Sequence, residues 1–242
     1  MDGHIYQLNE YSDSFKECVR KNLTFAKYME FDCSGTRWEQ IVSEGMKAKW
    51  RKSNDGLSDI YNPYTAWSAK TIKKPHPEHV KYADIISGRI QVQDYHKLVD
   101  SPNEIGRRII DTWNKRVFDA IEEYNDIRTI VLIRSPKMDR VVVFEELTEP
   151  YNSSEYTWKF NSKNVLEGYD SNDMRKFSWQ PSGTQFRIIS KVPFDKRIIL
   201  DIPYLGKRDE RKIDMFLENL GYVPYSTARD EAIRLDTFID EL

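Results

Sequence analysis

The chain has 242 residues, and its 37 Lys and Arg against 39 Asp and Glu give a formal net charge of −2 at pH 7. This length allows a substantial hydrophobic core, and we predict a single compact domain over residues 1–242. No apolar run is long enough to span a bilayer and the first residues lack the layout of a signal peptide, so we expect a cytoplasmic protein. A near-neutral charge excludes the strongly basic class of nucleic-acid-binding domains, so any contact with DNA must depend on local patches.

Cysteine, histidine and glycine usage argues against several common kinds of site. Cys18 and Cys33 suit free thiols in a reducing compartment, and they are too few and too far apart for a zinc site. The ten glycines are spread singly and form no phosphate-binding fingerprint. We predict no zinc site, because the four histidines are scattered along the chain: His4, His76, His79 and His96.

Two helices are predicted in the first 50 residues. Residues from about 11 to 29 carry apolar side chains at helical spacing, and so do residues from about 37 to 50, where no proline interrupts the pattern. Residues 34–36 supply a cap for the second of these helices. The apolar residues of that helix form one stripe: Trp38, Ile41, Val42 and Met46.

Glu39 is the candidate buried acid of the second helix. At about 100° per residue it lies at the edge of the apolar stripe, whereas Glu44 projects from the opposite side. A carboxylate on a half-buried face costs free energy unless it is paired or coordinates a metal. The partner of Glu39 is therefore either a metal ion or a basic residue at the helix edge, such as Arg37 or a lysine, and both interpretations stay open.

A β-hairpin is predicted next. Asp59 lies at the start of the hairpin, where the chain enters a strand at Asp59-Ile60, Asn62-Pro63 starts a turn, and residues 65–72 have the β-branched and aromatic side chains of a strand. Because strand side chains alternate between faces, Ser68 and Lys70 point the same way. The hairpin would therefore bring the polar side chains of Asp59, Ser68 and Lys70 to one spot.

This arrangement resembles the PD-(D/E)XK nuclease superfamily, whose core has an acid, a short gap, a (D/E)-X-K sequence on the next strand and usually a glutamate from an earlier helix. The resemblance implies that Asp59 and Glu39 bind Mg²⁺, with Mn²⁺ as a substitute, and that Lys70 orients or deprotonates the attacking water. Ser68 stands where the pattern expects an acid. Some restriction enzymes of the superfamily also carry Ser-X-Lys, so the implied catalytic set is Asp59, Lys70, Glu39 and Ser68.

The resemblance also implies a fold and an activity. We expect an α/β protein with a mixed central β-sheet flanked by helices, resembling a restriction-endonuclease core over residues of about 30–148. The expected activity is that of a type II site-specific deoxyribonuclease, which hydrolyses phosphodiester bonds of double-stranded DNA at a short sequence. The family further implies a homodimer on a palindromic site and a cognate DNA methyltransferase as a separate protein.

A non-catalytic alternative stays open. Because Ser68 removes one potential metal ligand, the same scaffold would suit a nucleic-acid-binding or regulatory protein that does not cut. The motif is also degenerate, and Lys70 by itself fits an ordinary solvated lysine on a strand.

Basic and polar residues after the hairpin are candidates for contact with DNA. Lys73 and Lys74 follow the strand directly, and Ser87-Gly88-Arg89 places an arginine beside a flexible glycine. Arginine binds phosphate or guanine edges in a bidentate manner. The alternative for residues 87–89 is a surface turn with a solvated arginine.

A long helix and two strands complete the predicted core. Ser101-Pro102 is a strong helix start, and the apolar pattern continues to about residue 124. Two strands follow at residues 128–134 and 140–145, and their continuous apolar runs are typical of strands covered on both faces.

The rest of the chain divides into a β-rich extension of about 150–203, expected to recognise DNA, and C-terminal helices of about 207–241. Residues 177–189 have the pattern of a hairpin with a turn at 180–183. Polar side chains at its tip are of the kinds that hydrogen-bond base edges and phosphates, although an ordinary polar turn has the same composition. They are Gln180, Ser182, Thr184 and Gln185.

Overall fold

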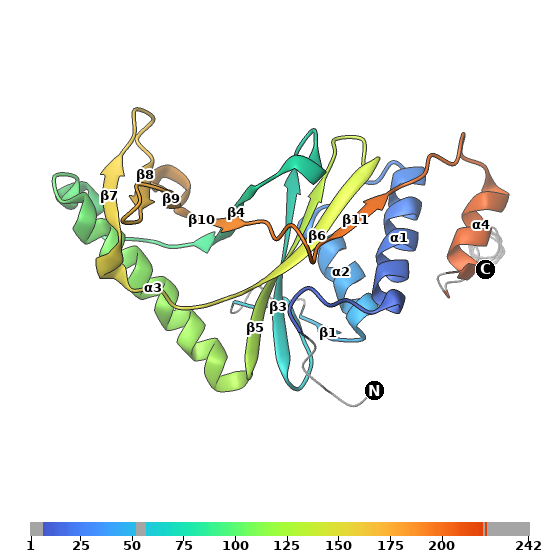
Figure 1. The fold of residues 1–242 in the computed structure, drawn as a ribbon, viewed down its shortest axis with the longest axis horizontal. Helices are drawn as coiled ribbons and strands as arrows, with labels where there is room; N and C mark the ends of the chain where they lie inside the picture. Colours follow the sequence, from blue (N-terminus) through green and yellow to red (C-terminus); the bar gives the residue numbers. More distant parts are fainter. Residues whose placement is uncertain (1–6, 52–56, 220, 222–242) are drawn as a thin grey trace, which may run out of the picture.

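The computed structural model describes residues 7–51, 57–219 and 221. The chain is a mixed α/β protein with two β-sheets, one mixed and one antiparallel, which confirms the predicted α/β class (Figure 1). Within the described ranges, no helix has both the length and the apolar character that crossing a bilayer requires. The part of the predicted C-terminal helices beyond residue 221 lies outside the described residues.

The first sheet is mixed because β3 and β5 are parallel neighbours whereas the other pairs are antiparallel. Its strands, in spatial order, are β1 (Lys49–Trp50), β2 (Ile60–Tyr61), β3 (Thr65–Lys73), β5 (Asp126–Arg134), β6 (Arg140–Leu147) and β11 (Ile198–Asp201). The predicted hairpin, and the strands at 128–134 and 140–145, are therefore confirmed as β2–β3, β5 and β6.

Helices α1 (Asp13–Tyr28) and α2 (Gly35–Met46) cover one face of this sheet, where they share a core with Trp67, Ala69 and residues of β5 and β6. The predicted continuation of the second helix to about residue 50 is wrong. Lys47 ends it in the left-handed conformation at φ 52°, and Lys49–Trp50 then forms β1. The chain is thereby turned back along the edge of the sheet beside the hairpin.

The second sheet is antiparallel and rich in aromatic residues. Its order is β4 (Tyr82–Arg89), β10 (Gln185–Lys191), β9 (Arg175–Gln180), β8 (Leu166–Tyr169) and β7 (Thr157–Phe160). The predicted hairpin over 177–189 is confirmed as β9–β10. The predicted core of about 30–148 and the predicted extension of about 150–203 do not form separate sheets. Strand β4 of the first region joins the second sheet, and β11 of the second region joins the first sheet.

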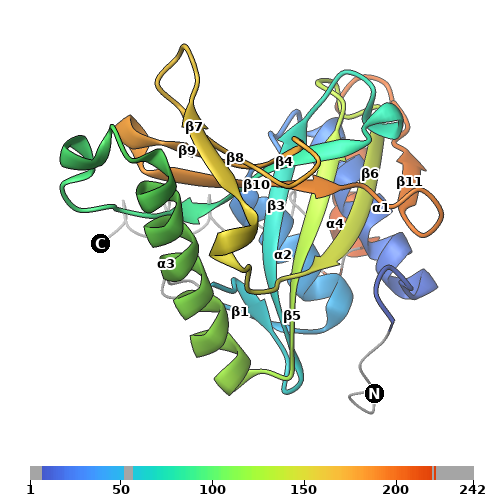
Figure 2. The ribbon, with the colours of Figure 1, turned by 60° about the vertical axis from the view of Figure 1, so that its left-hand side comes forward.

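The long helix α3 (Pro102–Glu123) begins at the predicted proline, but it packs mainly on the second sheet and not on the central one (Figure 2). Its apolar face, with Ile105, Ile109 and Trp113, shares a core with Trp158 and Phe177. The contact is close at Gly106, where an added methyl group would meet the Trp158 ring. The helix that the nuclease core was expected to include therefore supports the β-rich extension.

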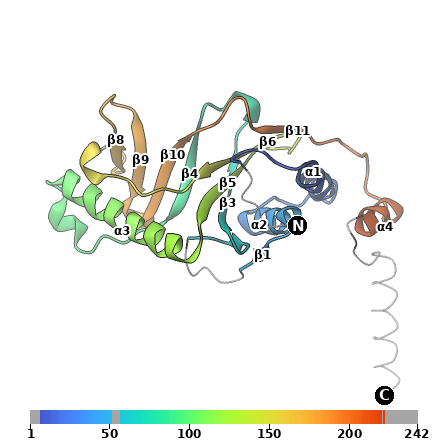
Figure 3. The ribbon, with the colours of Figure 1, turned by 60° about the horizontal axis from the view of Figure 1, so that its bottom comes forward.

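Four short 3₁₀ helices lie in the connections, and one further α-helix lies near the end of the described chain. They are η1 (Pro77–His79), η2 (Tyr95–Leu98), η3 (Ser153–Glu155), η4 (Pro181–Gly183) and α4 (Glu210–Asn219). Helix α4 lies beyond α1, at the end of the molecule away from α3 (Figure 3). Its Phe216 ring is 5.7 Å from that of Phe25 and 5.8 Å from that of Tyr28.

The two sheets meet along β4. Ala83 and Ile85 of this strand pack against Val131, Val142 and Phe144, on the face of the first sheet opposite the two N-terminal helices. The first sheet is thus covered on both faces in this region, as its apolar strands predicted.

Candidate functional site

Asp59 and Lys70 meet at the hairpin of the first sheet. The Asp59 Oδ2 atom accepts hydrogen bonds from the Ala69 N–H at 3.3 Å and the Ser68 hydroxyl at 3.4 Å, and it lies 3.6 Å from Lys70 Nζ. The two charged side chains are 22% and 27% exposed, so water still reaches them. The predicted convergence of Asp59, Ser68 and Lys70 is present in the structure.

Local sequence explains this geometry. The Asn62 side-chain oxygen accepts the N–H groups of Tyr64 and Thr65, both at 2.8 Å, which closes the turn. The resulting register places Ile60 opposite Trp67, and the Asp59 N–H, just before β2, donates to the Trp67 carbonyl at 2.9 Å. Because side chains alternate along a strand, Ser68 and Lys70 lie on the face of β3 opposite Trp67, which is buried under the helices.

Glu39 lies on α2, the helix that packs on the Trp67 face of the first sheet, and its own contact is with β1. Its Oε2 atom accepts a hydrogen bond from the Trp50 indole at 3.0 Å, while Arg37 lies over the Phe31 ring and not against Glu39. Burial raises the pKa of Glu39, and the negative charge of Asp59 raises it further. The Trp50 hydrogen bond and the positive charge of Lys70 act in the opposite direction. The charges of Asp59 and Lys70 thus act on Glu39, whose hydrogen bond is with Trp50.

The donor set suits a hard divalent cation. Mg²⁺ in proteins is commonly held by one or two carboxylates, with waters and substrate phosphates completing its shell. Glu39 of α2 and Asp59 before β2 are two carboxylates from separate segments, and burial is the main cause of the raised pKa of Glu39, with the charge of Asp59 adding to it. Glu39 and Asp59 therefore have the ligand chemistry that Mg²⁺ or Mn²⁺ prefers.

Ser68 makes a contact that an acid at this position would not make. Its side chain is buried, and its hydroxyl donates to Asp59 and so helps to fix the orientation of that carboxylate. The site therefore has two acids, and Ser68 acts on one of them as a hydrogen-bond donor.

Five of the residues predicted to contact DNA come together at one end of the second sheet. In the pairing of β4, β10 and β9, Arg89 lies opposite Gln185, and Gln185 lies opposite Gln180. The Thr184 carbonyl accepts the N–H of the residue after Arg89 at 2.8 Å. Gln180 donates to the Ser182 hydroxyl at 3.2 Å. Arg89 is exposed, so this end of the sheet presents an arginine together with amide and hydroxyl groups.

The other predicted DNA contacts lie elsewhere. Ser87 is within β4, where its hydroxyl donates to the Ile85 carbonyl at 3.2 Å, so residues 87–89 belong to a strand and not to a surface turn. Lys73 ends β3 with its ammonium 3.9 Å from Asp32. Lys74 follows it, and its N–H donates to the Arg134 carbonyl. Both lysines thus extend from the first sheet, whereas Arg89 extends from the second.

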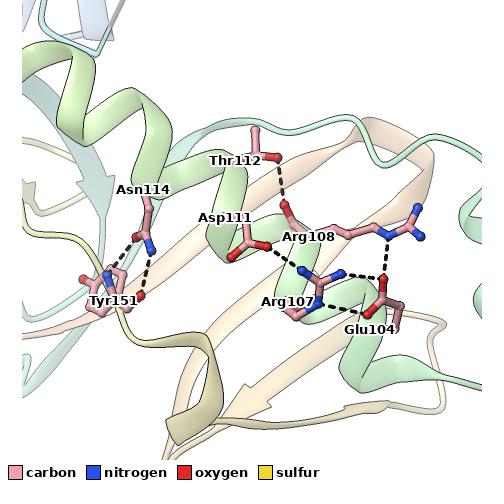
Figure 4. Close-up of polar contacts among 7 residues, drawn as sticks. All are labelled: Glu104, Arg107, Arg108, Asp111, Thr112, Asn114 and Tyr151. Carbon is pink, nitrogen blue, oxygen red and sulfur yellow. Dashed lines mark hydrogen bonds and ion pairs between the residues drawn. The ribbon is translucent and has the colours of Figure 1, made fainter.

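Arginines near the start of α3 are balanced within their own helix (Figure 4). Arg107 pairs with Glu104 at 2.8 Å and with Asp111 at 2.9 Å, and Arg108 also pairs with Glu104. Hydrogen bonds from the two arginines lower the pKa of Glu104 to about 2. The charges of Arg107 and Arg108 are therefore balanced by acidic residues of the same helix. Arg116, farther along α3, instead donates to the Arg89 carbonyl at 2.7 Å.

One group of potential ligands was not predicted from the sequence. His76, Glu78 and His79 lie together, so the description of the histidines as scattered is wrong for two of the four. The available signal was the spacing of the two histidines in His76-Pro-Glu-His79, because a proline after the first starts a tight 3₁₀ turn that brings positions three apart onto one side.

The chain was also compared with known proteins. No protein-family model, no curated protein and no solved structure matches it.

Proposed function

We propose that this protein is a Mg²⁺-dependent endonuclease of double-stranded DNA, similar in its chemistry to type II restriction enzymes. The observation that carries the proposal is the 3.6 Å contact of Asp59 with Lys70 at the β2–β3 hairpin. The charges of both residues also act on the pKa of Glu39 in α2. The order of elements supports it: a helix, a hairpin with the acid and the lysine, and a strand parallel to the lysine strand.

In this proposal Glu39 and Asp59 hold Mg²⁺, which when bound activates water and neutralises charge at the phosphorus. Lys70 lies 3.6 Å from Asp59, where its ammonium orients the attacking water or, when deprotonated, accepts its proton. Ser68 and the Ala69 N–H keep the Asp59 carboxylate in one orientation. Glu39, Ser68 and Lys70 come from a helix or a strand, which gives a reacting site more precise geometry than a loop does, and Asp59 directly precedes β2.

The DNA contacts proposed for this enzyme fall into two groups. Arg89, with Gln180 and Gln185 opposite each other across β9 and β10, offers donors and acceptors suited to base edges. Lys73 and Lys74 offer charge suited to phosphates. A homodimer on a palindromic site and a separate methyltransferase that protects the host DNA belong to the same proposal.

The test is a cleavage assay on diverse unmethylated DNA with Mg²⁺ or Mn²⁺. We expect wild-type protein to cut, and Lys70→Ala and Asp59→Asn each to lower the rate by about 10²-fold or more, in the range of removed proton-transfer groups. Lys191→Ala is the matched control, because Lys191 is an exposed strand lysine at the far end of β10 and should leave the rate unchanged. Uncut DNA with the wild-type protein, or full activity in Lys70→Ala, would overturn the proposal.

A second candidate function is nucleic-acid binding without cleavage. It is favoured by the three contacts made by a single Asp59 oxygen, because Lys70, Ser68 and the Ala69 N–H already satisfy that atom without a metal. Calorimetric titration with Mg²⁺ separates the two functions. An enzyme should take up metal in a way that disappears in Asp59→Ala, whereas a pure binding protein should show no such uptake.

A further inference from the structure

Two imidazoles and a carboxylate converge on the connection between β3 and β4. His76, Glu78 and His79 each offer one ligand atom, and these atoms lie within 4.8 Å of one another. The two rings have centroids 5.8 Å apart and planes inclined at 32°. The 3₁₀ helix η1 produces this arrangement, since the His79 N–H donates to the His76 carbonyl at 3.1 Å.

Glu78 carries an oxygen whose hydrogen-bonding capacity is unused. Its Oε1 atom lies 3.6 Å from an Arg140 nitrogen, but its Oε2 atom is buried and has no hydrogen-bond partner in the part of the chain that the structure describes. Arg140 itself pairs more closely with Asp201, at 2.7 Å. A buried carboxylate oxygen without a donor is costly, and a bound cation would satisfy it.

The segment that carries these ligands is held at several points. The Glu78 carbonyl accepts a hydrogen bond from the Arg197 guanidinium at 2.8 Å, and Pro77 is buried. Before the segment the Lys74 N–H is bonded to β5, and after it the Lys81 carbonyl accepts the Val192 N–H at 3.0 Å. The backbone of η1 is therefore fixed before any ion binds, which lowers the entropy that binding would cost.

We propose that His76, Glu78 and His79 form a binding site for a divalent transition metal of the Zn²⁺ class. Imidazole nitrogen favours Zn²⁺ and its neighbours in the first transition row, whereas Mg²⁺ prefers an all-oxygen shell. Two histidines and one glutamate are a known tetrahedral set with a fourth position open to water. Both imidazoles are exposed, so that position faces solvent.

This site is independent of the proposed nuclease chemistry. It shares no residue with the group formed by Glu39, Asp59 and Lys70, and its ligands select a different class of cation. Removal of the histidines therefore tests the metal site alone, and the Mg²⁺ experiments described above can fail without affecting it.

The test uses the full chain, with Co²⁺ absorption spectra and Zn²⁺ calorimetry as probes. We expect one equivalent of either metal to bind, Co²⁺ to give the visible bands of a tetrahedral site, and excess Mg²⁺ not to displace it. His79→Ala and Glu78→Gln should each weaken binding by at least about tenfold. The matched control is His96→Ala, which removes another exposed histidine and should leave affinity unchanged.

Circular dichroism of each metal-free variant would show whether it is folded. His76→Ala provides a second variant if one of the others fails this check. Absence of Co²⁺ or Zn²⁺ uptake by the wild-type chain would overturn the proposal. Equal affinity in wild type and in a folded variant that lacks either histidine would do so as well.

Discussion

Glu146 on β6 is a carboxyl group in surroundings that favour its protonated form. Burial raises its pKa from the ordinary value to about 7, although a hydrogen bond from the Ser190 hydroxyl at 2.6 Å acts in the opposite direction. In the unfolded chain the group ionises at an ordinary pKa of 4.5. Between these two pKa values the folded protein holds a proton that the unfolded chain has lost, so stability falls as pH rises through this interval.

We therefore expect Glu146→Gln to stabilise the protein at about pH 8 and to have little effect at about pH 5. At about 1.4 kcal/mol per pKa unit the full gain approaches roughly 3 kcal/mol, which is an upper value because part of the burial cost persists for an amide. Urea unfolding of the wild-type protein and of Glu146→Gln at the two pH values measures this difference in the free energy of unfolding. A gain of equal size at both would show that ionisation of Glu146 is not the cause.

Residue-scale expectations held where they depended on periodicity. Helical spacing placed Glu39 beside the core and Glu44 in solvent, and strand alternation placed Ser68 with Lys70, as the structure has them. The partner of Glu39 was not predictable in this way. Trp50 reaches it only because α2 ends at Lys47 and the chain turns back into β1, and that turn depends on a left-handed residue without a glycine signal.

At the scale of elements, the packing of α3 on the second sheet depends on one small residue. A Cβ atom added at Gly106 would lie 2.3 Å from the Trp158 ring, and Trp158 is itself buried. Gly168 of β8 approaches the other side of the same indole, where an added Cβ would lie 2.9 Å away. The indole is thus enclosed between a helix backbone and a strand backbone, and neither can carry a side chain there without displacing it.

Gly106→Ala should therefore destabilise the protein by about 1 to 3 kcal/mol, the usual cost of overpacking a core. This range is the net loss of stability. It already includes the gain of up to about 1 kcal/mol that comes from replacing a glycine within a helix. Thermal unfolding measures the change. Gly183→Ala is the control, because an added Cβ there would meet only Gln185, at 3.7 Å. Unchanged stability in Gly106→Ala would mean that α3 can shift away from the sheet.

The elements were largely predictable from sequence, but their partners were not. Proline at the start of α3 and the apolar pattern behind it define that helix, and the turn at 180–183 defines the β9–β10 hairpin. Neither pattern indicates that β4, which follows β3 in the chain, belongs to the second sheet. There it pairs with β10, a strand about 100 residues later in the chain. Pairing at such separation is decided by the shared core, which is why the boundary between the predicted core and extension does not follow the sheets.

At the scale of the whole molecule, β4 makes the two sheets dependent on each other. Its Ala83 and Ile85 side chains fill the space against Val131 and Phe144 of the first sheet, while its backbone pairs with β10 of the second. Unfolding of either sheet therefore removes packing contacts from the other. Two sheets joined only by a linker would lack this dependence and could unfold separately.

We accordingly expect a single cooperative unfolding transition for the full chain. Calorimetric and van't Hoff enthalpies of unfolding should agree. The unfolding curves followed by far-UV circular dichroism and by tryptophan fluorescence should coincide. The fluorescence reports both sheets, because Trp38 and Trp67 lie in the core of the first and Trp158 and Trp179 in that of the second. Ile85→Ala should lower the midpoint of this one transition by the amount expected for about 2 to 5 kcal/mol of lost core packing. Two separable transitions in the wild-type protein would contradict the expectation, since they would show that the contact along β4 is too weak to couple the sheets.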